Sequence, residues 1–180
     1  MNYFIGIVPP EIYKQRIVRF QQQWRNNKLP NIVEPHITLK AQGGLLLDLR
    51  WLEKVADCCK DIETFQLTLD KADFFGDDVL FLHVKSEEIL QLHKKIVHAV
   101  APTDQLIEQY MELEKYVPHL TLGQSHWGLS RDELKEMYGS INKNLELFQP
   151  FSVDYLRIYR ETEANHYTTY RDLYLKNASP

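Results

Sequence analysis

The chain contains one short motif twice, and its polar residues are of types that act on phosphates. Residues 35–39 read Pro-His-Ile-Thr-Leu, and residues 118–122 read Pro-His-Leu-Thr-Leu. The polar members of the two copies are His36, Thr38, His119 and Thr121. Because side chains alternate between the two faces of a strand, the histidine and threonine of each copy share one face. Each copy therefore predicts a strand with an apolar packing face and a His–Thr face that is free for chemistry.

Two histidines on facing strands suit general acid–base chemistry at a phosphodiester. Cleavage needs a base that deprotonates the attacking oxygen and an acid that protonates the leaving oxygen. Imidazole serves in both roles because its ordinary pKa, about 6.5, lies near working pH. Threonine hydroxyls can donate hydrogen bonds to the non-bridging oxygens and stabilise charge in the transition state. We therefore predict that His36 and His119 form the acid–base pair and that Thr38 and Thr121 bind the phosphate. The pattern leaves open which histidine is the base.

A purely structural interpretation of the motif is also open. Both His–Thr pairs could be polar, solvent-facing residues of half-exposed strands, and a short match between two segments is not rare. For one copy alone the two interpretations are balanced. Two complete copies among only seven histidines favour the functional interpretation. It predicts that His36 and His119 face each other across one cleft, far enough apart to admit a phosphate.

Apolar periodicity and turn signals predict many strands and few helices. Strands are predicted at residues 3–8, at both copies of the motif, and at residues 65–75, 79–84, 153–159 and 167–175. Helices are predicted from Pro10 to the Asn26–Lys28 region, at residues 46–60, after Ser86 and from Ser130 towards Leu145, with residues 101–116 as a connecting loop of some helical character. This order favours an α+β fold with antiparallel sheets over a doubly wound parallel sheet.

The separation of the two copies predicts internal pseudo-symmetry. The histidines are separated by nearly half of the 180 residues, and no linker, low-complexity tract or block of charge divides the chain. We predict one domain over residues 1–180, built from two similar lobes that face each other.

The two motifs, His36-Ile37-Thr38-Leu39 and His119-Leu120-Thr121-Leu122, resemble the paired His-x-Thr-x signature of the 2H phosphoesterase superfamily. That superfamily includes 2′-5′ RNA ligase-like proteins and cyclic nucleotide phosphodiesterases. Element order, motif spacing and single-domain length are similar as well, while outside the motifs the likeness is one of pattern alone. The resemblance implies a bilobal, LigT-like fold of two pseudo-symmetric antiparallel sheets with flanking helices. One motif strand from each lobe would line a central cleft.

The resemblance also implies a phosphoric diester hydrolase that acts on an RNA-like 2′,3′-cyclic phosphate or on a 2′-5′ linkage. Its partner would be a small nucleotide or an RNA end. Ligation is the same chemistry in reverse, and in dilute water we expect hydrolysis to prevail. The sequence has no recognisable metal-ligand set, phosphate-binding loop or dinucleotide fingerprint, so we expect neither a metal nor a cofactor. Two alternatives stay open: a non-catalytic module that binds a nucleotide or an RNA end, and an interaction scaffold whose His–Thr faces are coincidental.

Three further residues are candidates for substrate binding: Lys40, Ser125 and Tyr159. Lys40 and Ser125 continue the His–Thr faces of the first and second copy. Lys40 would add a positive charge beside the phosphate, and an unpaired surface lysine is the alternative. Tyr159 shares a strand face with Arg157, and that face either stacks a base and binds phosphate or is an ordinary sheet surface.

Composition argues against several classes of protein. The formal net charge of −4, with 44% hydrophobic and 26% charged residues, is typical of a soluble globular protein and disfavours sequence-blind binding of long nucleic acid. No apolar segment approaches the roughly 20 residues that span a bilayer, and the first residues read as a strand rather than a signal peptide. The only cysteines, Cys58 and Cys59, are adjacent and poorly placed to pair. We therefore expect a cytoplasmic monomer that does not engage a membrane.

Overall fold

The computed structural model describes residues 2–144 and 148–178 and confirms the α+β class. Within these residues the strands are β1 (Tyr3–Ile7), β2 (Ile37–Lys40), β3 (Phe65–Phe75), β4 (Val79–Lys85), β5 (His119–Gln124), β6 (Phe151–Val153), β7 (Tyr155–Glu163) and β8 (His166–Tyr174). The α-helices are α1 (Glu11–Gln21), α2 (Arg50–Lys60), α3 (Glu87–Val100), α4 (Asp104–Gln109) and α5 (Arg131–Asn144). Short 3₁₀ helices are η1 (Leu29–Asn31), η2 (Leu113–Lys115) and η3 (Ser125–Trp127).

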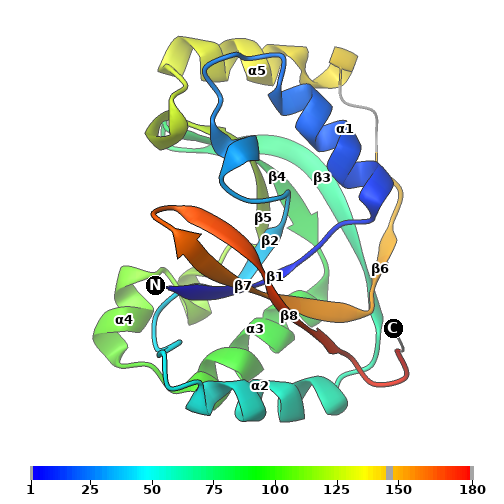
Figure 1. The fold of residues 1–180 in the computed structure, drawn as a ribbon. Helices are drawn as coiled ribbons and strands as arrows, with labels where there is room; N and C mark the ends of the chain where they lie inside the picture. Colours follow the sequence, from blue (N-terminus) through cyan, green and yellow to red (C-terminus); the bar gives the residue numbers. More distant parts are fainter. Residues whose placement is uncertain (1, 145–147, 179–180) are drawn as a thin grey trace.

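The strands of the described chain form one curled, antiparallel sheet in the order β6-β3-β4-β5-β2-β1-β7-β8 (Figure 1). This order divides into two halves, β6-β3-β4-β5 and β2-β1-β7-β8, each with a motif strand at its inner edge. The predicted pair of antiparallel sheets corresponds to these halves, which the structure joins edge to edge. The joint is a single antiparallel pair, Ile37 on β2 with Leu120 on β5.

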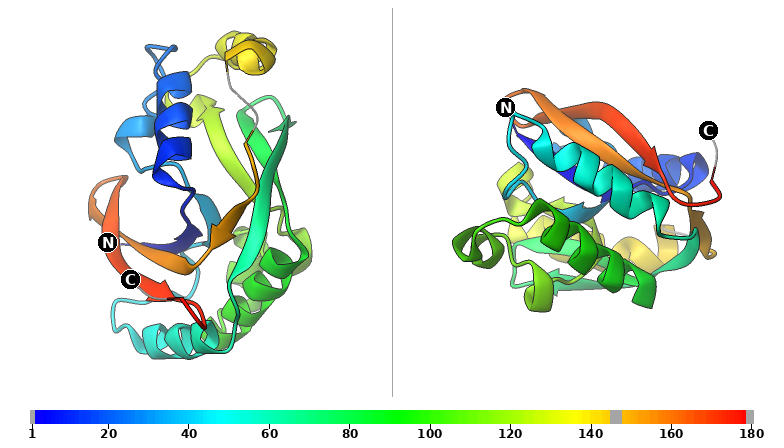
Figure 2. Two further views of the ribbon diagram at one scale, coloured as in Figure 1. Left: turned by 90° about the vertical axis from the view of Figure 1, so that its right-hand side faces the viewer. Right: turned by 90° about the horizontal axis from the view of Figure 1, so that it is seen from below.

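Each half of the sheet is covered by its own pair of helices. Helix α1 lies against β5 and α5 against β4, whereas α2 and α3 pack side by side, with α2 against β8 and α3 against β2 (Figures 1 and 2). The chain crosses between the halves, because α1 precedes β2 in sequence yet packs on β5, and α3 precedes β5 yet packs on β2. The lobes are therefore interleaved rather than consecutive in sequence.

Two helix boundaries differ from the predictions. The helix predicted at residues 46–60 begins at Arg50, because Leu49 has a left-handed φ of 58° and cannot belong to the first helical turn. Helix α1 ends at Gln21 and does not continue to Asn26. The chain turns after Gln21 so that Trp24 packs edge-on against Phe20, with ring centroids 5.2 Å apart.

The predicted N-caps of α3 and α5 are confirmed. The Ile89 amide donates to Ser86 Oγ over 3.4 Å. At α5 the Glu133 amide donates to Ser130 Oγ over 3.2 Å, and the Ser130 amide donates to the Glu133 carboxylate over 2.8 Å. This reciprocal pair is a capping box. Leu145, the predicted end of the helix, lies outside the described residues.

Two predicted segments differ in detail from the structure. The predicted connection at residues 101–116 contains helix α4. Thr103 is the N-cap of this helix, and its Oγ1 accepts a hydrogen bond from the Leu106 amide over 3.4 Å. The strand predicted at residues 153–159 is two strands that separate at Asp154. Strand β6 pairs with β3 and β7 pairs with β1, so these neighbours in sequence serve opposite halves of the sheet.

Strand β2 contains a β-bulge immediately after the motif threonine. Gly6 of β1 pairs with Thr38, and Ile5 pairs with Lys40, which leaves Leu39 as an extra residue on β2. A bulge interrupts the two-residue alternation of a strand. Leu39 and Lys40 are consequently both buried, and the His–Thr face ends at Thr38.

Strand β5 repeats this bulge at the matching position of the second motif. Phe81 of β4 pairs with Thr121, and Leu80 pairs with Gly123, which leaves Leu122 as the extra residue. Leu122 and Gly123 are both buried. The sequence repeat is therefore also a repeat in backbone geometry.

Side chains from neighbouring elements bind the main-chain carbonyls at both bulges. The four bonds run from Tyr116 to Thr38, from His93 to Leu39, from Gln21 to Thr121 and from Asn27 to Leu122, over 2.8, 2.7, 3.3 and 3.1 Å. A bulge disrupts the regular hydrogen-bond ladder, so carbonyls there need such partners. The bonds fix the backbone of the motif strands from outside the sheet.

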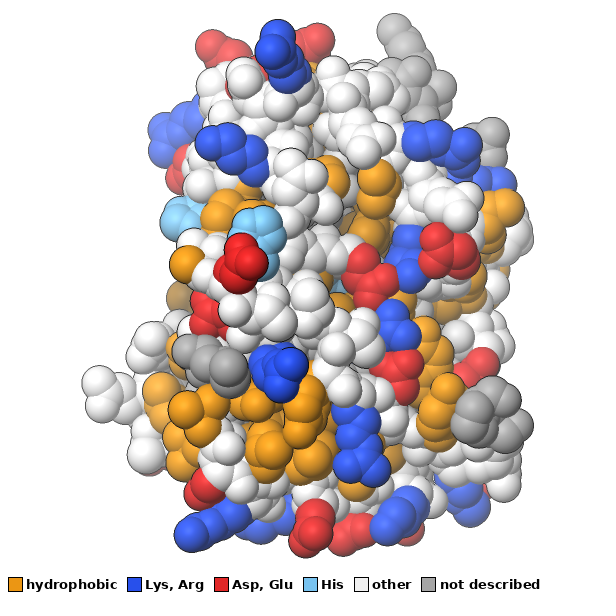
Figure 3. Space-filling view, in the orientation of Figure 1, with side chains coloured by type: hydrophobic (Ala, Val, Ile, Leu, Met, Phe, Trp, Pro, Cys, Tyr) orange, Lys and Arg blue, Asp and Glu red, His pale blue; other side chains and the backbone are white. Residues whose placement is uncertain are grey.

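The surface shows no large basic area on the face that Figure 3 presents. Lys and Arg side chains alternate there with Asp and Glu, in keeping with the net charge of −4. Within residues 2–144 and 148–178, no helix has the length and apolar character needed to cross a membrane.

Substitution of Gly123 by alanine tests how tightly α5 packs behind the second motif strand. A Cβ at Gly123 would lie 2.5 Å from Leu129 Cδ1 and 3.1 Å from Met137 Sδ. We expect Gly123→Ala to lower the free energy of unfolding by about 1–3 kcal/mol, the usual cost of overpacking.

Gly139→Ala is the matched control, because a Cβ at this exposed position of α5 meets no atom within 4 Å. The higher helix propensity of alanine should raise the free energy of unfolding by about 1 kcal/mol. Urea denaturation measures both substitutions, and shifts of the same sign would contradict the packing described.

Candidate active site

The two motif strands bring their polar side chains together at the centre of the sheet. The antiparallel register of β2 and β5 aligns His36 with Thr121 and Thr38 with His119. Residues aligned in this way project to the same side of the sheet. Diagonal neighbours on one side, such as the two histidines, are about 7–8 Å apart in a regular antiparallel pair, which leaves room for a phosphate between them.

His36 is half-buried and held by a carbonyl and two aromatic rings. Its Nδ1 lies 2.9 Å from the main-chain oxygen of Glu34. The ring centroids of Phe4 and Tyr159 lie 4.8 and 5.5 Å from that of the imidazole. These two rings also stack on each other at 4.5 Å. The imidazole therefore rests on a small aromatic cluster that is part of the sheet.

His119 has an equivalent arrangement. Its Nδ1 lies 2.7 Å from the main-chain oxygen of Val117, and the rings of Phe75 and Phe81 lie edge-on to it, with centroids 4.9 and 5.2 Å away. In both motifs the carbonyl belongs to the residue two positions before the histidine. The pseudo-symmetry thus extends to the hydrogen bonds that orient the rings.

These carbonyls determine which imidazole nitrogen can exchange protons with a substrate. A carbonyl oxygen only accepts, so Nδ1 of His36 and of His119 must carry the hydrogen. In the neutral ring Nε2 then has a free lone pair and can act as a base. In the protonated ring Nε2 carries a hydrogen and can act as an acid. Each histidine is therefore arranged for either role through the same atom.

Burial is the main cause that lowers the pKa of both histidines. For His36 the Glu34 carbonyl opposes this effect, while the nearby His119 lowers the pKa further. For His119 the Val117 carbonyl opposes burial in the same way, and His83 adds a small lowering effect. Burial therefore favours the neutral form of both rings in the free protein. A bound phosphate anion would raise both pKa values, because an adjacent negative charge favours the protonated form.

Glu34 anchors the backbone segment that orients His36. Its carboxylate accepts hydrogen bonds from Lys14 over 2.6 Å, Arg157 over 2.8 Å and the Tyr159 hydroxyl over 3.0 Å. Burial alone would raise the pKa of Glu34, but the bonds from Lys14 and Arg157 outweigh it and lower the pKa. Nothing in the sequence around Glu34 marks it, because its partners come from α1 and β7.

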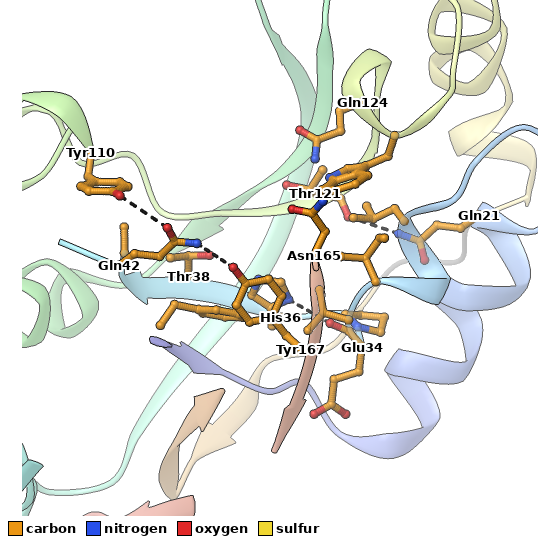
Figure 4. Close-up of a pocket in the computed structure, with 17 residues that line it drawn as sticks. Gln21, Glu34, His36, Thr38, Gln42, Tyr110, Thr121, Gln124, Asn165 and Tyr167 are labelled. Atoms are coloured by element: carbon orange, nitrogen blue, oxygen red, sulfur yellow. Dashed lines mark hydrogen bonds between the residues drawn. The ribbon is translucent and has the colours of Figure 1, made fainter. Parts of the chain in front are cut away.

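The cleft consists of two pockets that meet at the threonines. The His36 pocket has a volume of about 350 Å³, and its wall includes Phe4, Gln42, Trp127, Asn165 and Tyr167 (Figure 4). The His119 pocket has a volume of about 530 Å³, and its wall includes Phe75, Val79, Met111, Tyr116 and Val117. Both are lined by Thr38, Ala41, Tyr110, Thr121 and Gln124. These volumes are typical of small-molecule sites.

A chain of polar side chains crosses the wall of the His36 pocket (Figure 4). The Tyr110 hydroxyl donates to Gln42 Oε1 over 3.4 Å, and Gln42 Nε2 donates to the Tyr167 hydroxyl over 2.7 Å. Gln42 follows β2, Tyr110 follows α4 and Tyr167 lies in β8, so the three residues are far apart in sequence. None belongs to a motif, and only the tertiary fold brings them together.

The structure corrects the predictions for Lys40. Its side chain is 0% exposed and lines neither pocket. The ammonium donates to Glu112 Oε1 over 2.8 Å and to the carbonyls of Gly43 and Ala41 over 2.5 and 3.0 Å. Burial lowers the pKa of Lys40 and raises that of Glu112, and the bond between them opposes both shifts. The bulge at Leu39 turns this lysine away from the cleft, so it is neither beside the phosphate nor an unpaired surface residue.

Ser125 and Tyr159 also lie outside both pockets. Ser125 begins η3, beyond the bulge of β5, and its hydroxyl donates to Asp78 over 3.1 Å. Tyr159 is 1% exposed and supports His36 from beneath. Arg157 on the same strand face donates to Asp172 and Glu34, so this face is structural rather than a platform for a base.

Metal-binding side chains do not cluster in the described part of the chain. Among residues 2–144 and 148–178, no group of three or more His, Cys, Asp or Glu side chains is placed to hold a metal ion. Cys58 is half-buried and Cys59 is buried, and both are free thiols. That the protein works without a metal stays a prediction.

Comparison with known sequences shows the family of this chain. A sequence model of the 2′-5′ RNA ligase superfamily matches residues 8–165. The RNA 2′,3′-cyclic phosphodiesterase of Methanocaldococcus jannaschii is 23% identical over 171 residues, which cover 90% of this chain and 92% of that protein.

Solved structures share the fold along nearly the whole chain. TT0787 of Thermus thermophilus superimposes with a TM-score of 0.72 at 18% identity, and E. coli LigT complexed with phosphate superimposes with 0.60 at 16% identity. Each comparison covers 98% of both chains. At such identities the likeness concerns the fold alone. The sequence match carries the assignment, and it confirms the resemblance of the two motifs: the chain belongs to the 2′-5′ RNA ligase superfamily of 2H phosphoesterases.

Proposed function

We propose that this protein is a phosphoesterase that acts on a 2′,3′-cyclic phosphate or a 2′-5′ phosphodiester of RNA or a small nucleotide. The observation that carries the proposal is the β2–β5 register, which aligns each motif histidine with the threonine of the other motif. The family match supports the class of reaction. So does a relative that is named an RNA 2′,3′-cyclic phosphodiesterase.

In this proposal the two histidines divide the proton transfers. One enters the reaction neutral and takes a proton from the attacking water at Nε2. The other enters protonated and gives its Nε2 proton to the leaving ribose oxygen. The Thr38 and Thr121 hydroxyls donate to the non-bridging oxygens and stabilise the charge that develops on them. These groups suffice for the reaction, so no metal is required.

Ligation uses the same geometry in reverse. The 5′-hydroxyl of an RNA replaces water as the nucleophile at the cyclic phosphate, and the histidines keep their positions. Because water is far more concentrated than any RNA end, hydrolysis prevails in dilute solution.

We extend the proposal to the setting of the protein. One domain over residues 1–180 works as a monomer in the cytoplasm and takes a small nucleotide or an RNA end as its partner. The free state of both cysteines supports the cytoplasmic setting.

Alanine substitution tests the assignment of the two histidines. We expect His36→Ala and His119→Ala each to lower kcat for hydrolysis of adenosine 2′,3′-cyclic phosphate at least about a hundredfold, because each removes a proton-transfer group. His98→Ala is the matched control, since His98 is exposed on α3 and lines neither pocket. Chromatography of the products, in the presence of a chelator, measures the rates.

Three outcomes would count against the proposal. Full turnover by either active-site variant would remove that histidine from the mechanism. Loss of wild-type activity on adding chelator would show that a metal takes part. Tight nucleotide binding by calorimetry, with no product after long incubation, would favour a binding module over an enzyme.

The pH dependence of kcat/KM tests the lowered pKa values. Catalysis needs one neutral and one protonated histidine. A plot of kcat/KM against pH should therefore be bell-shaped, and its two apparent pKa values belong to the histidine pair as a whole. Burial lowers the pKa of both groups from 6.5, so we expect the maximum below pH 6.5 and a fall at higher pH as the acid loses its proton. The profile of kcat should lie at higher pH, because bound phosphate stabilises the protonated rings. A kcat/KM that still rises above pH 7.5 would contradict this.

A further inference from the structure

A buried histidine connects the bulge of β2 to the 3₁₀ helix η2. His93 Nδ1 lies 2.7 Å from the carbonyl oxygen of Leu39, and the Leu113 amide donates to His93 Nε2 over 2.8 Å. Leu39 is the extra residue of the bulge, and Leu113 is the first residue of η2. Because the carbonyl only accepts and the amide only donates, both bonds need the neutral ring with its hydrogen at Nδ1.

Asn27 makes the same two connections at the bulge of β5. Its Nδ2 donates to the carbonyl of Leu122 over 3.1 Å, and the Leu29 amide donates to its Oδ1 over 3.2 Å. Leu122 is the extra residue of that bulge, and Leu29 is the first residue of η1. An amide in one half and an imidazole in the other therefore make equivalent contacts, although their residue types differ.

Each 3₁₀ helix leads directly to the carbonyl that orients a motif histidine. The segment that η1 begins reaches Glu34, whose carbonyl oxygen lies 2.9 Å from His36 Nδ1. The segment that η2 begins reaches Val117, whose carbonyl oxygen lies 2.7 Å from His119 Nδ1. The two connections are therefore crossed: the bulge of β5 leads to the histidine before β2, and the bulge of β2 leads to the histidine of β5.

The surroundings of His93 keep its ring in the neutral state that both bonds need. Burial is the main cause that lowers the pKa of His93 to about 4. The Leu39 carbonyl opposes this effect, and the nearby charges of Lys40 and Lys94 add to it. The ring also stacks on Tyr116, with centroids 3.8 Å apart, so its contact extends to the residue that follows η2.

The segment around η2 has a strained backbone that buried contacts maintain. Met111 and Leu113 have left-handed φ values of 53° and 56°, which are unfavourable for side chains of this kind. The Lys40–Glu112 ion pair of 2.8 Å fixes the residue between them. Such a conformation persists only where the surrounding structure determines it. Loss of a contact to this segment should therefore let it relax and displace the Val117 carbonyl.

We propose that Asn27 and His93 are positioning residues, each of which transmits the position of one motif strand to the histidine of the other motif. This inference rests on the proposed function and adds two buried residues that act through His36 and His119. Asn27 lines neither pocket, and His93 is only 1% exposed where it borders the His119 pocket. Because proton transfer tolerates little displacement, the crossed connections keep both rings aligned on one phosphate.

The crossing predicts a response that a purely structural role does not. Asn27→Leu removes a contact to the second motif strand, yet we expect His36, in the first motif, to respond. NMR of the imidazole nitrogens, at a pH where both rings are neutral, should show that His36 loses its fixed Nδ1–H tautomer while His119 keeps it. His93→Phe retains a ring against Tyr116 and should have the opposite effect, on His119 and not on His36.

The same variants should slow the chemical step. We expect Asn27→Leu and His93→Phe each to lower kcat for hydrolysis of adenosine 2′,3′-cyclic phosphate about tenfold, because a displaced ring transfers its proton less well. KM should change less than kcat, since neither side chain is proposed to bind substrate. Asn27→Ser and His93→Gln keep one polar group and replace an apolar variant that does not fold. They should affect the same ring in the same direction.

Gln21→Leu is the matched control for the NMR measurement. Gln21 Nε2 donates to the Thr121 carbonyl of β5 over 3.3 Å, but within residues 2–144 and 148–178 no hydrogen bond joins this side chain to η1. The variant should leave His36 in its Nδ1–H tautomer.

Two results would overturn the positioning roles. One is that both rings keep their tautomers in the variants of Asn27 and His93. The other is a response of the histidine on the strand that the substituted residue contacts. A wild type that does not turn over the cyclic phosphate would instead overturn the proposed function, and the NMR comparison would still decide whether the connections are crossed.

Discussion

The whole site depends on the one antiparallel pair that joins the halves of the sheet, Ile37 with Leu120. Both side chains are fully buried, so the register is fixed by packing on the apolar side of the strands. A slip of one residue would reverse every side chain of a strand from one face to the other. The histidine and threonine of that strand would then leave the cleft, and the two motifs would no longer share one face. The apolar residues of the motif are therefore as necessary to the site as the polar ones.

The alternation of residues predicts the site up to the threonines and not beyond. Within His-x-Thr the two-residue period holds, and the structure brings both pairs to one cleft. After Thr38 and Thr121 each strand has a bulge. The residue types do not predict it, because the extra residue of each bulge is an ordinary leucine, Leu39 or Leu122. The predicted substrate contacts of Lys40 and Ser125 depend on the period continuing, and they fail for that reason. The same bulges leave carbonyls that α1, α3 and Tyr116 bind, so each motif strand is fixed from outside the sheet.

The fold class and most strands follow from local sequence, whereas the surroundings of the histidines do not. Glu34 anchors the segment that orients His36 only because Lys14 and Arg157 meet its carboxylate. Met111 borders the cleft only because a buried ion pair holds its strained segment against β2. Such contacts join residues far apart in the chain, and no periodicity or short motif encodes them. They also make the halves differ: the motifs are symmetric, while the wall of the His119 pocket is more apolar than that of the His36 pocket.

The central claim is that both histidines act on one phosphate, and titration with inorganic phosphate followed by NMR of the imidazole nitrogens tests it most directly. We predict that the Nε2 signals of His36 and His119 respond together, with one dissociation constant and a stoichiometry of one. Both pKa values should rise, because the same anion stabilises both protonated rings. A response of only one histidine, or two different dissociation constants, would show that the motifs do not share a phosphate and would contradict the account.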